Sequence, residues 1–281
     1  MRVLRTPAEL SEWTEAARRE DRRVGLVPTM GFLHRGHLSL MEACRGRADL
    51  TAVSIFVNPT QFGPNEDLAR YPRDLEGDLK KCRETGVDVV FAPESGAMYP
   101  AGHRTFVEVA QLQDGLCGAR RPGHFRGVAT VVLKLLGIFT PTRAYFGEKD
   151  AQQLAVIRRA AKDLDLPAQI VGCPTVREAD GLAMSSRNSY LDAGQRRAAP
   201  VLYRALTAAR DAVRGGERNA GALRRLMQGV IEKEPLARID YVSVADPDTF
   251  RELSSLDGPA LALLAVRVGP ARLIDNLRLE V

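Results

Sequence analysis

The chain has 281 residues, of which 45% are hydrophobic and 27% are charged, and its formal net charge at pH 7 is +5. This composition is typical of a soluble globular protein with one large or two ordinary domains. The mild basic excess does not indicate nucleic-acid binding, because the arginines are scattered and only 6% of residues are aromatic. An anionic small-molecule substrate accounts for the excess equally well.

The cysteines and the apolar stretches point to an intracellular protein. Cys44, Cys82, Cys117 and Cys173 lie far apart without a Cys-x-x-Cys pair, so neither a zinc site nor a disulfide framework is expected. Residues 1–23 lack the apolar core of a signal peptide. The longest apolar stretches are too short, or interrupted by Lys134, to span a membrane. We therefore expect a cytoplasmic location and no membrane partner.

The first part of the chain alternates between two patterns. Short apolar runs predict buried strands at 24–27, 50–57, 87–91, 144–146 and 168–171. Amphipathic runs predict helices over 38–48, 75–84, 125–139 and 151–164. Strands that alternate with helices of this length predict an α/β fold with a parallel sheet and right-handed crossovers.

The last hundred residues follow another pattern. Helices are expected over 193–214 and 220–234, with Gly215-Gly216 between them. Strands are expected over 239–244, 261–268 and 273–279, separated by turns at Asp246-Pro247 and Gly269-Pro270. These elements predict a small α+β domain with antiparallel strands. We place the boundary near Asp180-Gly181, which gives domains of residues 1–180 and 181–281.

The most informative segment runs from Val27 to Leu38, where a strand turns into a helix. His34 and His37 lie at this junction with Gly36 between them. Such a junction offers backbone N–H groups and the positive end of the helix dipole to a phosphate. Alone, the two histidines are equally compatible with a loop in which they satisfy local backbone groups. Two later segments favour the phosphate site.

A second segment, Phe56 to Asp67, follows the next predicted strand and so belongs to the same edge of the sheet. The amides of Asn58 and Gln61 can both donate and accept hydrogen bonds. They suit a small polyhydroxylated or carboxylated substrate. Further on, Arg120 and Arg121 precede a helix, where they could guide anions or simply be solvated.

The third segment is Gly147-Glu148-Lys149-Asp150, again after a strand. Lys149 is a point charge suited to phosphate oxygens. Asp150 is either a helix N-cap or a functional group. Gln153 lies one helical turn further and faces the same side.

The fourth segment, Met184-Ser185-Ser186-Arg187, offers two hydroxyls and a guanidinium, which match phosphate geometry. Standing alone, it would be interpreted as an ordinary polar linker.

Together these motifs resemble the pantothenate synthetase family, the pantoate–β-alanine ligases. The motifs that carry the resemblance occur in order: Pro-Thr-Met-Gly-x-Leu-His-x-Gly-His, Asn-Pro-Thr-Gln-Phe, Tyr-Phe-Gly-Glu-Lys-Asp-x-Gln-Gln and Ser-Ser-Arg-Asn. The resemblance covers nearly the whole chain, although His-x-Gly-His alone is shared with nucleotidyltransferases and class I aminoacyl-tRNA synthetases. Departures at Phe32, Arg35 and Met184 remove no group that the chemistry needs.

The resemblance implies a Rossmann-like domain, a smaller lid domain and a homodimer. It also implies a two-step reaction, in which pantoate and ATP form pantoyl adenylate and β-alanine then displaces AMP. Mg²⁺ is expected with ATP, without an assigned protein ligand. No nucleic-acid partner is expected.

The resemblance also implies the site residues. ATP is assigned to Met30, Gly31, Phe32, Leu33, His34, Arg35, Gly36, His37, Gly147, Glu148, Lys149, Asp150, Val176, Met184, Ser185, Ser186 and Arg187. Pantoate is assigned to Gln61 and Gln153, to which we add Asn58. His37 is the implied proton donor, and we group it with His34 and Lys149 as catalytic residues.

Three other functions compete with this interpretation. A nucleotidyltransferase would share His-x-Gly-His but would not need the paired glutamines. An aminoacyl-tRNA synthetase fragment would need an anticodon-binding domain, whereas the residues after Asp180 are few and not strongly basic. A regulatory nucleotide-binding module without turnover would not need so many charged groups in one cleft.

Overall fold

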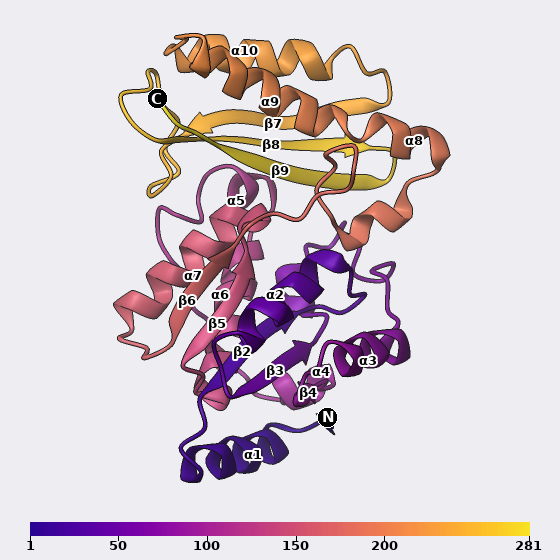
Figure 1. The fold of residues 1–281 in the computed structure, drawn as a ribbon, viewed down its shortest axis with the longest axis vertical. Coiled ribbons are helices and arrows are strands. Elements are labelled where there is room, and N and C mark those ends of the chain that lie inside the picture. The colour runs from indigo at the N-terminus through magenta and orange to yellow at the C-terminus, as the bar shows by residue number, and fades with distance from the viewer. The chain divides into compact units, whose positions relative to one another are not determined.

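The structure is a computed structural model that describes all residues from Met1 to Val281. The chain forms two compact units, and each is described by itself (Figure 1). The first unit comprises Met1–Gln113, Arg121–Glu148 and Gln153–Pro174. The second comprises Asp114–Arg120, Lys149–Gln152 and Thr175–Val281. Two short pieces, 114–120 and 149–152, thus belong to the second unit although the first surrounds them in sequence.

A six-stranded parallel sheet forms the centre of the first unit, which confirms the predicted α/β fold (Figure 1). The strand order is β1-β4-β3-β2-β5-β6. The strands are β1 (Arg2–Leu4), β2 (Val24–Thr29), β3 (Leu50–Ile55), β4 (Val89–Phe91), β5 (Arg143–Gly147) and β6 (Gln169–Cys173). The edge strand β1 was not predicted, and β3 ends before the predicted residue Val57.

Helices cover both faces of this sheet. They are α1 (Pro7–Arg19), α2 (Arg35–Arg45), α3 (Leu75–Glu84), the short α4 (Ser95–Met98), α6 (His124–Phe139) and α7 (Ala151–Asp163). Side chains of α1, α6 and α7 pack in one apolar cluster with Leu26 of β2, and those of α2 and α3 pack in another with Val27. Because neighbouring residues of a strand point to opposite faces, these two clusters lie on opposite sides of the sheet.

The sheet opens at the carboxyl ends of its two central strands. β2 pairs with β3 as far as Thr29, but with β5 only at Gly25 and Leu26. Pro28 has no backbone N–H group, so it cannot donate a hydrogen bond to a neighbouring strand. The strand that follows β2 in sequence lies on its other side, so the order of winding reverses between β2 and β5. In open α/β sheets, ligands bind at such a reversal, outside the carboxyl ends of the strands.

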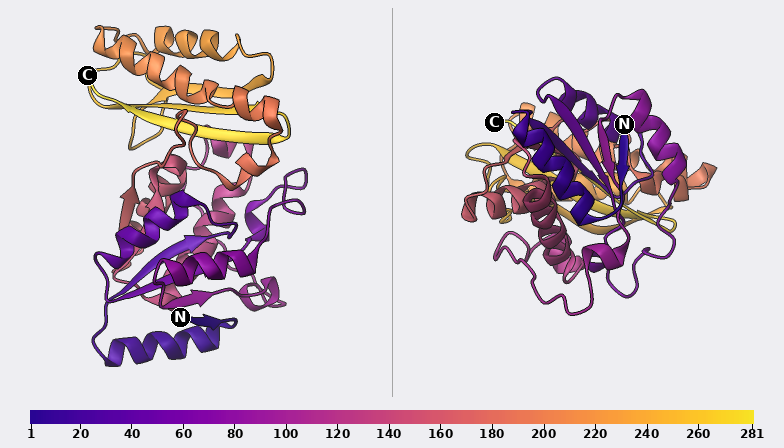
Figure 2. Two further views of the ribbon diagram at one scale, coloured as in Figure 1. Left: turned by 45° about the vertical axis from the view of Figure 1, so that its right-hand side comes forward. Right: turned by 90° about the horizontal axis from the view of Figure 1, so that it is seen from below.

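The second unit is built on an antiparallel sheet, as predicted, in the order β7-β8-β9. Its strands are β7 (Ala237–Ala245), β8 (Ala260–Val268) and β9 (Ala271–Leu279). The helices α9 (Val201–Arg214) and α10 (Ala220–Ile231) cover one face (Figure 2). The single helix expected over 193–214 is in fact two, α8 (Ala193–Ala198) and α9, because Pro200 cannot donate to the helical ladder.

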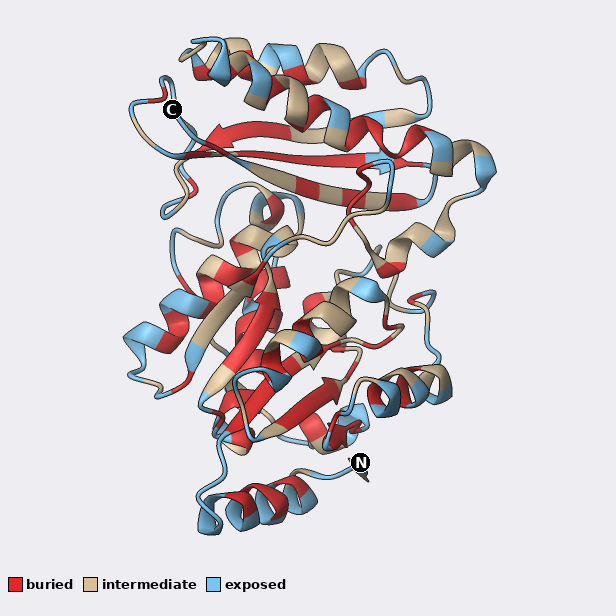
Figure 3. Cartoon of the chain, in the orientation of Figure 1, coloured by how far each residue is buried: buried red, intermediate tan, exposed pale blue.

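Burial follows the layers in each unit. The strands and the inward sides of the helices are buried, and the outward sides are exposed (Figure 3). The short helix α5 (Cys117–Arg120) and the 3₁₀ turn η3 (Ser186–Tyr190) belong to the second unit. None of the helices has both the length and the apolar character needed to cross a membrane.

One glycine sets how closely α6 approaches the 3₁₀ turn η1 (Pro59–Gln61) that follows β3. A Cβ atom on Gly127 would lie 2.6 Å from the backbone nitrogen of Gln61 and would also collide with the Thr60 carbonyl. The carbonyl of Gly127 accepts a hydrogen bond of 3.1 Å from Asn58. The position of Gln61 therefore depends on the absence of a side chain at residue 127.

We expect Gly127→Ala to lower the free energy of unfolding by about 1–3 kcal/mol, because the added methyl group must push backbone atoms aside. The matched control is Gly137→Ala in the same helix, where an added Cβ meets nothing within 4 Å. That control should raise stability by about 0.5–1 kcal/mol, as alanine favours a helix. Denaturant unfolding of both variants measures this, and equal effects would contradict the packing argument.

Candidate active site

Two imidazoles close the amino-terminal end of α2. His34 is the N-cap residue, and its Nδ1 accepts a hydrogen bond of 3.1 Å from the Gly36 N–H. The Nδ1 of His37 accepts one of 3.3 Å from the His34 N–H, and the ring centroids are 4.0 Å apart. An imidazole that accepts at Nδ1 carries its proton on Nε2. The helix therefore holds both rings as neutral Nε2–H donors.

The helix begins one turn earlier than predicted. The periodic apolar residues start at Leu38, but α2 starts at Arg35 because the His34 side chain provides the cap ahead of them. His34 thus caps the helix and His37 lies in its first turn, where the helix dipole favours an anion.

A buried carboxylate holds the loop between β2 and α2. The N–H groups of Phe32 and Leu33 donate to the two Asp78 carboxylate oxygens, each at 2.7 Å. Burial raises the pKa of the Asp78 carboxyl, and the two backbone donors oppose this effect. Gly31 has a φ of +81°, and a Cβ there would lie 2.9 Å from Asp78 Oδ2. The carboxylate and the glycine together fix the path of the loop.

This arrangement corrects one expectation from the sequence. The junction was expected to offer free backbone N–H groups to a phosphate. In the structure, the N–H groups of Phe32, Leu33, His34 and Gly36 donate to side chains of the protein itself. The candidate phosphate contacts of this loop are therefore the imidazole Nε2 atoms rather than those four amides.

Asn58 and Gln61 form a connected pair in and beside η1. The Asn58 amide donates to Gln61 Oε1 and to the Gly127 carbonyl, both at 3.1 Å, and its oxygen accepts from Tyr99 at 2.9 Å. Gln61 Nε2 lies 3.3 Å from the sulfur of Met30. The hydrogen-bonding groups of Asn58 are thus used within the protein. Asn58 thus orients the Gln61 side chain.

A second set of contacts, which the sequence did not predict, holds the backbone of Gln61. His124 Nδ1 lies 2.9 Å from the Gln61 carbonyl, and its Nε2 lies 2.9 Å from Arg121 Nη1. Arg121 also pairs with Glu66 at 2.6 Å. Burial acts to raise the pKa of the Glu66 carboxyl, but Arg121, together with His124 and the Gly63 backbone, holds that pKa below its usual value. Arg121 is therefore structural rather than a solvated loop residue, whereas Arg120 is largely exposed.

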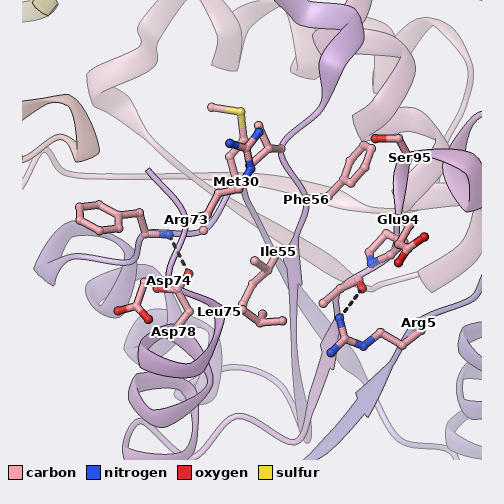
Figure 4. A pocket seen from close by; sticks show the side chains of 15 residues that line it. Arg5, Met30, Ile55, Phe56, Arg73, Asp74, Leu75, Asp78, Glu94 and Ser95 are labelled. Carbon is pink, nitrogen blue, oxygen red and sulfur yellow. Dashed lines mark hydrogen bonds between the residues drawn. The ribbon is translucent and has the colours of Figure 1, made fainter. Parts of the chain in front are cut away.

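A cavity of about 300 Å³ lies at the same edge of the sheet (Figure 4). Met30 and Phe56 line it together with Arg5, Arg73 and Glu94. Each of its arginines donates to backbone carbonyls, Arg5 to Ala92 and Arg73 to Tyr71 and Leu68. The two guanidinium groups therefore stabilise the backbone that forms the wall of this cavity. Met30 is common to the cavity and to the Gln61 contact.

The remaining predicted residues divide between the two units. Met30–His37, Gln61, Gly147, Glu148 and Gln153 are in the first unit, and Lys149, Asp150, Val176 and Met184–Arg187 are in the second. Lys149 Nζ lies 3.6 Å from Asp150 Oδ2. The Ser185 hydroxyl accepts from the Arg187 N–H at 3.3 Å and so caps η3. The polar segment after Met184 is therefore an ordered turn.

Comparison with known proteins identifies the family. A family model described as pantoate-beta-alanine ligase matches residues 2–278. A pantothenate synthetase of Heliobacterium modesticaldum is 56% identical over 281 residues, covering 100% of both chains. One of Roseiflexus castenholzii is 58% identical over 277 residues, covering 99% of this chain and 100% of the relative. The chain belongs to the pantoate–β-alanine ligase family.

Solved structures agree with this assignment. The pantothenate synthetase of Thermus thermophilus matches this ligase with a TM-score of 0.94 at 50% identity, over 99% of each chain. The Francisella tularensis pantoate-beta-alanine ligase, complexed with beta-gamma ATP and β-alanine, matches with a TM-score of 0.82 at 34% identity, over 99% of this chain and 97% of that one. The resemblance read from the motifs is confirmed.

The family assignment fixes the activity. The chain is an ATP-using ligase that joins pantoate to β-alanine, in the class EC 6.3.2.1. The competing functions of a simple nucleotidyltransferase, a synthetase fragment and a regulatory module are thereby set aside.

We expect Asp78→Asn to destabilise the ligase by about 1–3 kcal/mol and to reduce its activity, because the amide can accept only one of the two buried backbone N–H groups. The control is Asp74→Asn on the same helix. Asp74 caps α3 through the Gly77 N–H, and asparagine caps about as well. Thermal unfolding and the rate of pantothenate formation measure both effects. An Asp78→Asn protein as stable and active as the Asp74→Asn control would refute this role of the carboxylate.

Proposed function

We propose that this ligase works in two steps through a pantoyl adenylate. The carboxylate oxygen of pantoate attacks the α-phosphorus of ATP, and the bond to the departing pyrophosphate breaks. The amine of β-alanine then attacks the acyl carbon, loses a proton, and AMP leaves with the electrons of the broken acyl–phosphate bond. The observation that best supports this proposal is the pair of imidazoles whose Nδ1 atoms accept backbone N–H groups at the start of α2, beside the reversal between β2 and β5.

We assign ATP to the Met30–His37 loop and to Gly147–Asp150, Val176 and Met184–Arg187. His34 and His37 donate to phosphate oxygens, and Lys149, Ser185, Ser186 and Arg187 add a positive charge, two hydroxyls and a guanidinium fork. Gln61 and Gln153 bind pantoate, and Asn58 orients Gln61. These assignments rest on the motifs and on the tautomers that the helix imposes.

Positioning supplies more of the rate than proton transfer does. The pantoate carboxylate is already an anion, so the first step needs alignment and charge neutralisation rather than a base. Aligning two reactants is worth roughly 7–11 kcal/mol. A single proton donor contributes about 10²–10⁴-fold. The donor role of His37 is therefore the smaller part of its task, and holding the phosphate is the larger.

We propose that Mg²⁺ enters with the triphosphate and neutralises part of its charge. Both Asp78 oxygens accept backbone N–H groups, and Asp150 lies beside Lys149, so neither carboxylate is a ready ligand. The metal would then be held by phosphate oxygens and water, which is its usual coordination with nucleotides.

Three further proposals concern the whole protein. Residues 1–180 act as the nucleotide- and pantoate-binding domain, and residues 181–281 act as a lid, since water would hydrolyse an acyl adenylate. The protein is a homodimer, as its family resemblance implies. Its location is the cytoplasm, which its four free, buried cysteines suit.

The test follows pyrophosphate and AMP separately. We expect pantoate and Mg-ATP alone to yield pyrophosphate, and sustained AMP release to require β-alanine. His37→Ala should lower the rate of pyrophosphate release by about 10²-fold or more, and Lys149→Ala by about 10–100-fold through the lost charge-assisted contact.

Lys80→Ala, at an exposed position of α3, is the control and should be unaffected. A His37 or Lys149 variant that keeps the control's rate and melting temperature would remove that residue from the proposed site. AMP release that does not depend on β-alanine would contradict the two-step reaction.

A further inference from the structure

The β9 strand carries a polar side chain that contacts the backbone of Lys149. Asn276 Nδ2 donates a hydrogen bond of 2.8 Å to the Lys149 carbonyl. Both residues belong to the second unit, although they are 127 positions apart in the sequence. Residues 149–152 are thus hydrogen-bonded to β9 at Lys149.

Asn276 is itself held in place by a buried ion pair. Its backbone N–H donates to Asp275 Oδ1 at 2.8 Å, and its carbonyl accepts from Arg177 Nη2 at 3.3 Å. Arg177 Nη1 and Nη2 donate to the two oxygens of the Asp275 carboxylate, at 2.6 and 2.9 Å. Burial raises the pKa of the Asp275 carboxyl, and Arg177 opposes this rise. A bidentate pair of this kind fixes geometry as well as charge.

Arg177 is fixed from two further sides. Its Nη1 donates to the Gly181 carbonyl at 3.1 Å, and its guanidinium lies 4.3 Å from the centre of the Tyr203 ring. Arg177 also lies where the chain enters the second unit, since that unit resumes at Thr175. The same guanidinium therefore connects the entering segment, β9 and, through Asn276, the backbone of Lys149.

The other end of the 149–152 piece is fastened as well. Gln152 accepts from the Cys117 N–H at 3.1 Å and donates to the Gly115 carbonyl at 2.9 Å. These bonds tie it to the neighbouring piece 114–120. Gln152 holds one end of residues 149–152. The hydrogen bond from Asn276 to the Lys149 carbonyl holds the other end, which carries the ammonium group.

We propose that Asn276 is a positioning residue for Lys149, and that the Arg177–Asp275 pair sets Asn276 for this task. The inference rests on the proposed role of Lys149 at the triphosphate. A hydrogen bond to the carbonyl of Lys149 fixes the backbone from which the ammonium group extends. Small displacements of an aligned group are costly for a reaction that depends on positioning.

The experiment is a double-mutant cycle on pantoate-dependent exchange of pyrophosphate into ATP, with kcat and the KM for ATP measured separately. The variants are Asn276→Ala, Lys149→Ala and the double variant. Asn276→Leu removes the donor at nearly constant volume, and Arg278→Ala is the control at an exposed position of the same strand. Melting temperatures are recorded for all variants.

We expect Asn276→Ala and Asn276→Leu to lower kcat/KM for ATP by roughly 3–10-fold, the value of one hydrogen bond. Arg278→Ala should leave it unchanged. In the Lys149→Ala background, Asn276→Ala should change the rate by less than about twofold, because the group it positions is gone.

The outcomes separate the two proposals. Unimpaired exchange by Lys149→Ala would overturn the proposed ATP contact of Lys149. An impaired Lys149→Ala protein beside fully active Asn276 variants would overturn the positioning role alone. The positioning role would also be overturned if the rate losses of the two single variants multiply in the double variant, because Asn276 would then act independently of Lys149.

Discussion

The loop between β2 and α2 depends on two hydrogen bonds from its backbone to the carboxylate of Asp78. Buried N–H groups need acceptors, and in this loop and the start of α2 side chains provide them at five places. Asp78 takes two of these donors, the Nδ1 atoms of His34 and His37 take one each, and the Thr29 hydroxyl takes that of Gly31. As a consequence both imidazoles keep their protons on Nε2. The requirement that shapes the loop thus also orients the two donors that we propose bind a nucleotide phosphate.

Contacts elsewhere in the first unit also fix the position of a residue near this loop, Gln61. Gln61 is oriented by Asn58 and held at its carbonyl by His124, and the absence of a side chain at Gly127 lets α6 approach it. Such layers of support suit the ligation that we propose, because its first nucleophile is already ionised and alignment then contributes most to the rate. In the second unit, Lys149, which we propose contacts ATP, is supported in the same manner, since Asn276 donates to its carbonyl.

Much of the fold was predictable, because buried parallel strands are continuous apolar runs and the helices between them are amphipathic. The first strand and helix were missed because residues 1–23 are highly charged. The signal for α1 was present in Thr6, Pro7 and Glu9, which form a capping box with proline at the first turn. The motif residues of the site could also be found, but their supports could not. Asp78 looks like a surface residue of an amphipathic helix, and the partners Glu66 and Arg121, or Arg177 and Asp275, are 55 and 98 positions apart. No local pattern connects such pairs.

The Nδ1 contacts at the start of α2 impose the Nε2–H tautomer on both His34 and His37. Nitrogen-15 NMR of the imidazole side chains at neutral pH measures this directly, and the chain has only four histidines to assign. We expect His34 and His37 each to show an unprotonated Nδ1 and a protonated Nε2 in the unliganded protein. A proton on Nδ1 of either ring, with α2 intact, would contradict it.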